Sequence, residues 1–531
     1  MSVDQNLIDT WIDADPDPNT RRELLEADPH DLADRFSGPL VFGTAGLRGP
    51  VRAGPNGMNT AVVIRTTAGI AQWLHGRCLG GSTVIVGRDT RHGSETFATA
   101  AAEVLAAAGF RVVQLPDPTP TPVVAFACRK LKAAVAIQIT ASHNPATDNG
   151  YKVYLDGGAQ IISPADRDIE AAIAAVGPAN SVPRAAVEAS GAHLVDEYIA
   201  RVATLPRGTD RGLRIAFTPM HGVGGATALA AFRAAGFTDI HVVDEQFDPN
   251  PDFPTVEFPN PEEPGATDLL LATADRVDAD IAIALDPDAD RCAVGVKGPN
   301  GWFMLCGDDT GAVLGDYILS HTSGDRLAAT TIVSSSMLKS IAASHNSRYS
   351  ETLTGFKWLA RAGDGLVFAY EEALGLCVDP AAVRDKDGIS AAVVACDYAA
   401  NLKSAGRTFL DVLDDLAAQH GVHLTAQVSR RFNNLAHIAA SMTTLRNNLP
   451  KELGGAPVVV EDLNELRGPK RTDAIILRTD QLRVVVRPSG TEPKLKCYLE
   501  AVAPTAAGDL SAARQQAERL LDVGRAFAHT L

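Results

Sequence analysis

The feature that most constrains the fold is an order of segments that recurs three times along the chain. Each time, apolar runs rich in β-branched residues alternate with helix-like stretches, many of them rich in Ala. The predicted strands cover 83–89, 110–115 and 133–140, then 213–220, 239–246 and 280–286, then 327–335, 348–354 and 366–370. The predicted helices cover 94–108 and 121–131, then a stretch from Gly225 and 266–278, then 338–344 and a stretch from Lys357. Such alternation favours mainly parallel sheets flanked by helices, so we predict three related α/β domains.

The two ends of the chain do not follow this order. The first forty residues, rich in Asp, Pro and Leu, predict an acidic helical segment. Near the C-terminus, apolar runs at 473–480, 482–490 and 494–502 precede a helix-like stretch from Ser511, which indicates a smaller α+β domain. We therefore predict four domains, at 1–206, 207–322, 323–428 and 429–531.

Charge and composition exclude several classes of protein. The 48 Lys and Arg against 64 Asp and Glu give a net charge of -16, the wrong sign for holding nucleic acid or an anionic membrane over a broad surface. No apolar run approaches the ~20 residues that span a bilayer, and the N-terminus is acidic where a secretory signal would be basic. Seven scattered cysteines without a C-x-x-C pair indicate a reducing compartment. We expect a cytoplasmic protein with no nucleic-acid or membrane partner.

Three carboxylates follow the last strand of the second repeat, in the segment DPDADR. Asp286, Asp288 and Asp290 stand at alternate positions, and three oxygens so spaced in a tight loop can converge on one hard cation. An EF-hand is excluded, because Arg291 and Lys297 stand where that loop needs Gly and Glu. With only three protein oxygens the site favours Mg²⁺, which commonly completes its shell with water and phosphate. A solvated acidic turn is the alternative.

The last strand of the first repeat ends in TASHNP, which places Ser142 and His143 at a turn formed by Asn144 and Pro145. An ordinary polar turn and a nucleophilic serine both fit this segment. The chain has no G-x-S-x-G elbow of the kind that serine hydrolases carry.

Basic residues gather in RPSGTEPKLK, after an apolar strand near the C-terminus. Its cations and hydroxyls surround a Gly-centred turn and form either a phosphate cradle or a plain hairpin. The residues concerned are Arg487, Ser489, Thr491, Lys494 and Lys496. Single cations also stand in FGTAGLRG (Arg48), TLTGFKW (Lys357) and RDKDG (Lys386), the last of which also fits an ion-paired surface loop.

The second repeat contains HGVGGAT at 221–227, with Asp244 about twenty residues on. This partly matches a dinucleotide-binding fingerprint, but Thr227 stands where a third Gly or Ala is required. We interpret the segment mainly as a turn at the start of a helix. A G-x-x-x-x-G-K-[ST] loop is absent from the sequence, which argues against a P-loop nucleotide hydrolase.

In this order, the segments FGTAGLRG, TASHNP, DPDADR, YEEALG and RPSGTEP resemble the signature motifs of the α-D-phosphohexomutases. They span about residues 42–500, nearly the whole chain. The N-terminal segment, TGFKW and EEALG are most similar to the branch of phosphoglucomutase-2 and phosphopentomutase type enzymes, alongside proteins called phosphomannomutases. The resemblance implies a fold of three related α/β domains with mixed, mainly parallel sheets and a C-terminal α+β domain, arranged around a central cleft.

The resemblance also implies roles for individual residues. Ser142 is implied to be the phosphorylated nucleophile, whose phosphate holds Mg²⁺ together with the three Asp side chains. Implied catalytic or substrate-contacting residues near that serine are Arg48, His143, Lys152, Arg291 and Lys386. Implied sugar-binding residues are Thr354, Gly355, Lys357 and Glu371, and the implied site for the non-reacting phosphate comprises Arg487, Ser489, Gly490 and Thr491. The identity of the general base stays open.

The reaction implied is the interconversion of hexose 1-phosphate and hexose 6-phosphate, with glucose 1,6-bisphosphate as the activator. Ala373 stands where many family members have Ser, which removes one sugar hydrogen bond. We therefore expect glucose to be favoured and mannose to be accepted, with phosphopentomutase or phosphomannomutase activity as the alternative. A nucleotide-dependent oxidoreductase and a non-catalytic phosphosugar-binding protein are the rivals from other classes. Nothing in the sequence indicates the oligomeric state.

Overall fold

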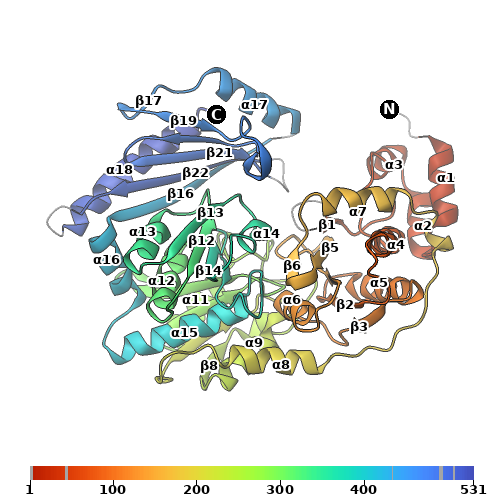
Figure 1. The fold of residues 1–531 in the computed structure, drawn as a ribbon, viewed down its shortest axis with the longest axis horizontal. Helices are drawn as coiled ribbons and strands as arrows, with labels where there is room; N and C mark the ends of the chain where they lie inside the picture. Colours follow the sequence, from red (N-terminus) through yellow and green to blue (C-terminus); the bar gives the residue numbers. More distant parts are fainter. Residues whose placement is uncertain (1–3, 42–45, 433–434, 490–493, 506–508) are drawn as a thin grey trace. The chain divides into compact units, whose positions relative to one another are not determined.

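The computed structural model describes residues 4–41, 46–432, 435–489, 494–505 and 509–531. They form two compact parts: Met1–Met304 with Gly375–Ala400, and Leu305–Leu374 with Asn401–Leu531. The helices and strands appear in Figure 1.

The first part begins with the predicted acidic helical segment. Its helices are α1 (Gln5–Ala14), α2 (Pro18–Glu26) and α3 (Pro29–Arg35). The carboxylates of Asp4, Asp17 and Asp28 accept backbone N–H groups at the three helix starts, which explains the high Asp content of this segment.

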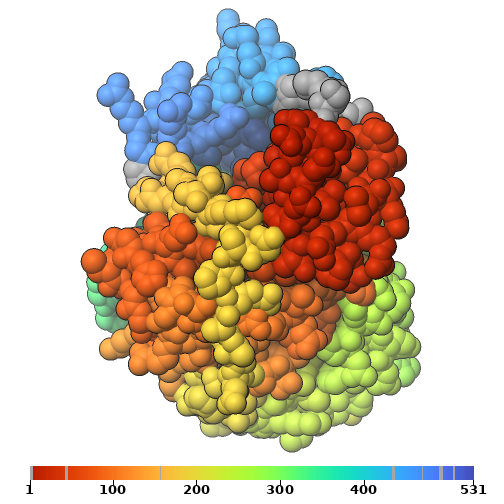
Figure 2. All heavy atoms as spheres, turned by 90° about the vertical axis from the view of Figure 1, so that its right-hand side faces the viewer, coloured from red at the N-terminus to blue at the C-terminus, as the bar shows by residue number. Residues whose placement is uncertain are grey.

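The first sheet has the strand order β1-β5-β4-β2-β3, with β6 paired to β5. The parallel core strands are β2 (Thr83–Arg88), β3 (Arg111–Gln114) and β4 (Val135–Ile139), which confirms the three predicted strands. Antiparallel strands β5 (Asp148–Leu155) and β1 (Gly46–Pro50) extend it, as does the short β6 (Ala159–Gln160). The helices of this domain are α4 (Thr60–Gly76), α5 (Ser94–Ala107), α6 (Thr121–Lys130) and α7 (Ala165–Ala174). Figure 2 shows the chain between α7 and α8 (His193–Val202), in yellow, crossing the surface.

The second sheet has the order β11-β10-β9-β7-β8. Strands β7 (Arg214–Thr218), β8 (Asp239–Val242) and β9 (Ile281–Leu285) are parallel, and β10 (Cys292–Gly298) and β11 (Gly301–Met304) add an antiparallel hairpin. Its helices are α9 (Gly224–Ala234), α10 (Asp244–Phe247) and α11 (Asp268–Arg276). The prediction of a strand through residue 246 was wrong at its end, because Asp244 begins α10. Strand β15 (Gly375–Cys377), which is not part of this sheet, and helix α15 (Gly388–Ser404) come much later in the chain, and the first part includes β15 and most of α15.

In the second part, β12 (Leu327–Thr331) lies between β13 (Arg348–Thr352) and β14 (Leu366–Glu371), all parallel. The helices are α12 (Gly307–Ser320), α13 (Met337–Ser344), α14 (Phe356–Leu359) and α16 (Phe409–His420). Helix α12 packs against β14 and α13, so it belongs to the third sheet, whereas the predicted boundary at 322/323 assigned it to the second domain.

The C-terminal sheet is antiparallel, in the order β16-β22-β21-β20-β19. Its strands are β16 (Val422–Arg431), β19 (Val459–Asp462), β20 (Ile475–Arg478), β21 (Leu482–Pro488) and β22 (Lys494–Ala503). Helices α17 (Leu435–Asn447) and α18 (Leu510–Ala528) and the short pair β17 (Glu452–Leu453) and β18 (Ala456–Pro457) complete the domain. Strand β16 pairs with β22 along its whole length, so this sheet begins at Val422, ahead of the predicted boundary at 428/429.

Among the described residues, no helix combines the length and apolarity needed to cross a membrane. The first and last sheets each have an apolar core, as the burial of Val84, Ile137 and Leu74 in the first and of Leu477, Val484 and Leu521 in the last illustrates. A smaller buried cluster joins Val333, just after β12, to the C-terminal sheet.

A buried carboxyl group links the start of α12 to the end of β14. Asp308 accepts the Ser335 backbone N–H at 2.6 Å and the Tyr370 hydroxyl at 3.0 Å. Burial raises the pKa of Asp308 to about 7 from its ordinary value of 3.8. A carboxyl group with a raised folded-state pKa binds protons more tightly in the folded state, so its contribution to stability falls as the pH rises from about 4 to about 7.

We therefore expect the Asp308→Asn variant to gain stability over the wild type as the pH rises. The amide keeps an oxygen for both donors but carries no charge. Its free energy of unfolding relative to wild type should increase by roughly 2–4 kcal/mol between pH 4.5 and pH 8. Urea unfolding of both proteins at the two pH values measures this difference; an equal difference at both values would contradict the assignment.

Candidate functional site

The three predicted metal-ligating carboxylates lie in the tight loop between β9 and β10. Asp286, Asp288 and Asp290 are at most 1% exposed, and one oxygen of each lies within 4.8 Å of the others. Ala289 takes a left-handed conformation with φ of 60°, and its N–H donates to the Asp286 carbonyl, which turns the chain back on itself. The acidic turn is therefore buried and convergent, which excludes the solvated alternative.

The HGVGGAT segment packs directly under this loop. A Cβ on Gly222 would come within 2.3 Å of Pro287 Cα, and one on Gly224 within 2.7 Å of the Ala289 side chain. The Val223 N–H donates to the Pro287 carbonyl at 2.8 Å. These contacts explain the glycines as supports for the acidic loop, where the sequence also allowed a dinucleotide site.

The acidic loop fits a hard cation. Asp288 Oδ1 and Asp290 Oδ1 are buried and have no hydrogen-bond partner among the described residues. The other oxygens of these two side chains, Asp288 Oδ2 and Asp290 Oδ2, accept hydrogen bonds from the Lys152 ammonium at 2.6 and 2.8 Å. Two buried anionic oxygens left open beside a third carboxylate form an oxygen-ligand set of the kind that Mg²⁺ prefers.

Ser142 lies beside this loop. It follows β4, is 3% exposed and has a left-handed φ of 54°. Its hydroxyl donates to Asp286 Oδ2 at 2.9 Å and lies 3.3 Å from His143 Nδ1. The predicted nucleophile and the predicted metal ligands thus meet across 144 residues of sequence.

Arg91 fixes the loop that carries Ser142. Its guanidinium donates to the backbone carbonyls of Ser142, Asn144, Pro145 and Asp148, at 2.5 to 3.0 Å. The arginine is itself 3% exposed and follows β2. Arg91 is not among the residues predicted from the sequence, although its position just beyond the end of a parallel strand was a usable signal.

Two lysines face the acidic loop. Burial lowers the pKa of Lys152, but the carboxylates of Asp288 and Asp290 outweigh burial and the net pKa is raised, so the ammonium keeps its charge. Lys386 Nζ lies 3.3 Å from Asp290 Oδ2, in a loop whose Gly388 N–H donates to the Ala289 carbonyl. The RDKDG segment therefore belongs to the site and is not a surface loop.

The remaining predicted residues of the first part surround Ser142. Arg48 donates to the Asn144 side chain at 2.8 Å, and the Arg291 N–H donates to Asp286 Oδ1 at 3.0 Å. Burial, assisted by Arg291 and Arg48, lowers the pKa of His143 well below its usual value, so its imidazole is neutral. The first part thus brings together all nine residues predicted there, listed here in order: Arg48, Ser142, His143, Lys152, Asp286, Asp288, Asp290, Arg291 and Lys386.

The second part carries the residues predicted to bind substrate. Thr354 and Gly355 lie between β13 and the short α14, and Lys357 is the second residue of α14. Gly355 has a φ of 106°, which favours glycine. Glu371 ends β14, and the next side chain, Glu372, accepts the Ser334 hydroxyl at 3.0 Å. Both loops therefore follow strands of the same sheet, β13 and β14, which lie on either side of β12.

The predicted phosphate loop lies at the end of the β21–β22 pair. Arg487 and Lys496 stand directly opposite each other, and the Ser489 N–H donates to the Lys494 carbonyl at 2.8 Å. Like charges opposite each other on neighbouring strands repel, and an anion placed there relieves the repulsion. Gly490 and Thr491 lie outside the described residues.

Comparison with protein families agrees with this geometry. Models of the phosphoglucomutase/phosphomannomutase family match in order: alpha/beta/alpha domain I at 39–179, domain II at 196–300, domain III at 306–420 and the C-terminal domain at 452–517. The match to domain III begins at residue 306 and so includes α12.

Individual relatives carry several names. A probable phosphomannomutase of Haemophilus influenzae is 41% identical, covering 84% of this chain and 93% of its own. Human phosphopentomutase is 33% identical (94% and 91%), and a phosphoglucomutase of Staphylococcus aureus is 31% identical (93% and 95%). The solved structure of a putative phosphomannomutase from Thermus thermophilus shares the fold, with a TM-score of 0.71 and 24% identity over 93% of this chain and 99% of that one. The chain belongs to the phosphoglucomutase/phosphomannomutase family and is a phosphomutase, an intramolecular phosphotransferase.

Proposed function

We propose that this phosphomutase interconverts hexose 1-phosphate and hexose 6-phosphate, with glucose favoured and mannose accepted, through a phosphoserine at Ser142. The observation that carries the proposal is the Ser142 hydroxyl, which lies 2.9 Å from a carboxylate of the buried acidic loop. A serine that only shaped a turn would not need three buried carboxylates and two lysines around its hydroxyl. A binding protein without catalysis would not need them either.

The residues around Ser142 suit a phosphoryl carrier. In the first half-reaction a sugar hydroxyl attacks the phosphorus of phosphoserine, the bond to Ser142 Oγ breaks, and the sugar proton passes to a base. The bisphosphate then returns its other phosphate to Ser142, which regenerates the enzyme. Lys152 keeps its charge and would stabilise the anionic phosphoryl group, and the neutral His143 lies beside the Ser142 hydroxyl.

We further propose that Mg²⁺ is held by Asp286, Asp288 and Asp290 with the phosphate of Ser142, and that glucose 1,6-bisphosphate activates the enzyme. When bound, Mg²⁺ would neutralise charge on the phosphoryl oxygens. Arg48, Arg291 and Lys386 would contact the substrate or its transferring phosphoryl group.

For the sugar, Glu371 would bind the hydroxyl groups, with Thr354, Gly355 and Lys357 beside it. Arg487 and Ser489, with Gly490 and Thr491, would hold the phosphate that does not react. The partner is then a small phosphosugar, and we expect the enzyme to work in the cytoplasm.

The specificity test is a comparison of kcat/KM for the 1-phosphates of glucose, mannose and ribose. We expect glucose to be best and mannose to follow within about tenfold, because Ala373 lacks one hydrogen bond worth about 0.5–1.5 kcal/mol. The similarity to human phosphopentomutase makes the pentose the competing candidate. A ribose 1-phosphate rate above both hexoses would overturn the hexose assignment while leaving the phosphomutase class intact.

Arg91 gives a second test, of the loop that positions Ser142. A lysine has one ammonium in place of a planar guanidinium and cannot reach the four carbonyls at once. We expect Arg91→Lys to lower kcat by about ten- to a hundredfold through misplacement of Ser142. Arg88→Lys is the matched control, because among the described residues the Arg88 guanidinium makes only a 3.4 Å hydrogen bond to the Asp89 carbonyl and a 4.0 Å contact with Glu95. Equal kcat values for the two variants would show that Arg91 does not position the loop.

A further inference from the structure

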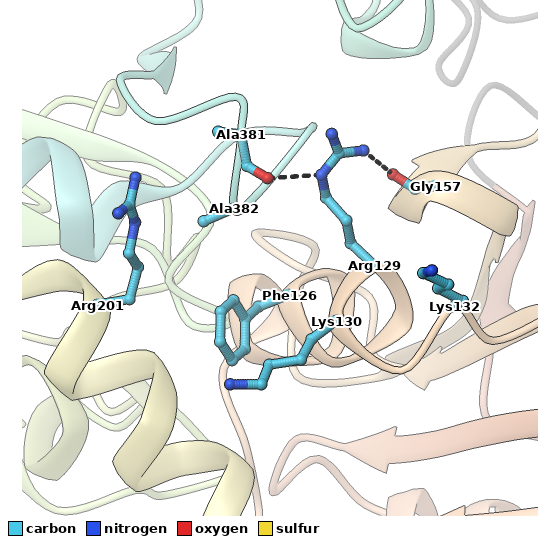
Figure 3. A pocket seen from close by; sticks show the side chains of 8 residues that line it. All are labelled: Phe126, Arg129, Lys130, Lys132, Gly157, Arg201, Ala381 and Ala382. Atoms are coloured by element: carbon cyan, nitrogen blue, oxygen red, sulfur yellow. Dashed lines mark hydrogen bonds between the residues drawn. The ribbon is translucent and has the colours of Figure 1, made fainter.

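A cavity of about 780 Å³ lies in the first part at the C-terminal end of α6. Its lining consists of Phe126, Arg129, Lys130, Lys132, Gly157, Arg201, Ala381 and Ala382 (Figure 3). Four of these eight residues are cations and none is acidic, on a chain whose net charge is -16. The volume lies in the range of about 300–1,000 Å³ that is usual for small-molecule sites.

Two of the four cations are already neutralised. Lys130 pairs with Glu197, and Arg201 pairs with Asp379 at 2.7 Å. Arg129 and Lys132 have no carboxylate partner among the described residues: Arg129 donates only to the backbone carbonyls of Ala381 at 2.6 Å and Gly157 at 3.1 Å. The cavity therefore keeps two positive charges that no described side chain neutralises.

Lys132 also lines a second cavity of about 340 Å³, together with Trp73, Arg77, Ser82 and three aliphatic residues. The Arg77 guanidinium lies 4.7 Å from the centre of the Trp73 ring. Neither cavity has an acidic residue in its lining. Lys132 thus lines both cavities, each of which is basic and partly apolar. Such a lining suits a ligand with both a charged and an uncharged portion.

The geometry points to a second binding site, separate from the Ser142 site, that takes a small organic phosphate monoester. Arg129 and Lys132 supply the charge for the phosphate, and Phe126, Ala381 and Ala382 supply an uncharged wall for the organic portion. This assignment does not depend on which sugar the enzyme converts.

The cavity is connected to the Ser142 site by two segments. Helix α6 begins at Thr121, whose hydroxyl donates to Asp288, and ends at the cavity. Ala381, which lines the cavity, lies five residues before Lys386 in the sequence, and Lys386 contacts Asp290. In the same loop, Asp385 accepts the Gln160 side chain at 2.8 Å. A ligand on Arg129 and Lys132 should therefore restrain the 379–388 loop.

Hydrogen–deuterium exchange of the full chain, with phenyl phosphate as the probe and phenol as its uncharged counterpart, tests the site. We expect phenyl phosphate to slow exchange in peptides covering 126–132 and 379–388, and phenol to leave them unchanged. In the Lys132→Gly variant the probe concentration needed for half-maximal protection should rise at least about tenfold. Lys132 has a φ of 49° at the position after α6 where glycine is favoured. The Lys132→Gly variant should therefore fold, and its melting temperature should be no lower than that of the wild type.

Asn346→Gly is the matched control, because Asn346 follows α13 with a φ of 52° and the same pattern of closing hydrogen bonds. It should bind the probe like wild type. The site is overturned if protection appears only around 487–496, if phenol protects equally, or if Lys132→Gly binds undiminished.

Discussion

Ser142→Ala should lower kcat by a factor on the order of 10³ or more, the largest effect expected of any single substitution in this chain. An alanine has no oxygen to carry the phosphoryl group, so the cycle cannot begin. The backbone should be kept, since alanine tolerates the left-handed φ of 54° as well as serine does and Arg91 still holds the loop by its carbonyls. KM should change far less, because Arg487 and Ser489, which we propose hold the non-reacting phosphate of the substrate, are far from Ser142 in sequence and are retained in the variant. Steady-state kinetics and a thermal melt measure the two effects separately.

Ser37→Ala is a suitable control, because Ser37 is exposed and donates only to the Asp34 carbonyl among the described residues. It should leave kcat unchanged. Near-normal turnover by Ser142→Ala would rule out Ser142 as the phosphoryl carrier, whatever the sugar.

Removal of divalent metal should abolish turnover almost completely, and Mg²⁺ should restore it. Without a bound metal ion, the three buried carboxylates would repel one another and the phosphate that we propose for Ser142. Burial and the neighbouring Asp288 and Asp290 already raise the pKa of Asp286 well above its usual value, which shows how poorly this loop accommodates three charges. The measurement is the rate after dialysis against EDTA and after readdition of Mg²⁺.

The matched control for this experiment is a thermal melt in the same buffers, since loss of activity through unfolding would not return with Mg²⁺ on the timescale of the assay. Full turnover in excess EDTA, after metal analysis has verified that the protein is metal-free, would contradict the assignment of Asp286, Asp288 and Asp290.

Periodicity predicted the parallel core of each α/β domain well, because fully buried strands are short apolar runs: β9 (IAIAL) is unbroken, and β4 (VAIQI) is interrupted only by Gln138. It did not predict the antiparallel strands that follow the functional loops. Strand β5, with the sequence DNGYKVYL, contains Gly150 and Lys152, which break an apolar pattern. Both residues have structural reasons: a Cβ at 150 would lie 2.5 Å from the Thr140 carbonyl oxygen, and Lys152 reaches the acidic loop.

Domain boundaries were harder to predict. Packing against a sheet decides the domain to which a helix or strand belongs, and the position of the nearest Pro or Gly in the sequence does not reveal that packing. Helix α12 precedes the predicted boundary yet packs against β14. Likewise, the predicted boundary at 428/429 falls inside β16, where the sequence carries no turn signal and the strand continues without a break.

The candidate site was predictable where a motif carries its chemistry locally, as in DPDADR and TASHNP. Contacts between distant segments were not predictable from spacing. Lys152 and Asp288 are 136 residues apart, and Arg91 acts on backbone carbonyls, which leave no trace in side-chain patterns. The rule that ligands bind beyond parallel strand ends applies to β2 as well as to β4, and it would have singled out Arg91.

The central claim, that Ser142 carries the phosphoryl group, is tested most directly by tandem mass spectrometry of active enzyme. Enzyme treated with glucose 1,6-bisphosphate should contain one phosphoserine, in the peptide that includes Ile139–Asn144, and phosphatase treatment should remove both this phosphate and the activity. Renewed exposure to the bisphosphate should restore both together. Active enzyme with Ser142 unmodified, or with its phosphate on another residue only, would contradict the account.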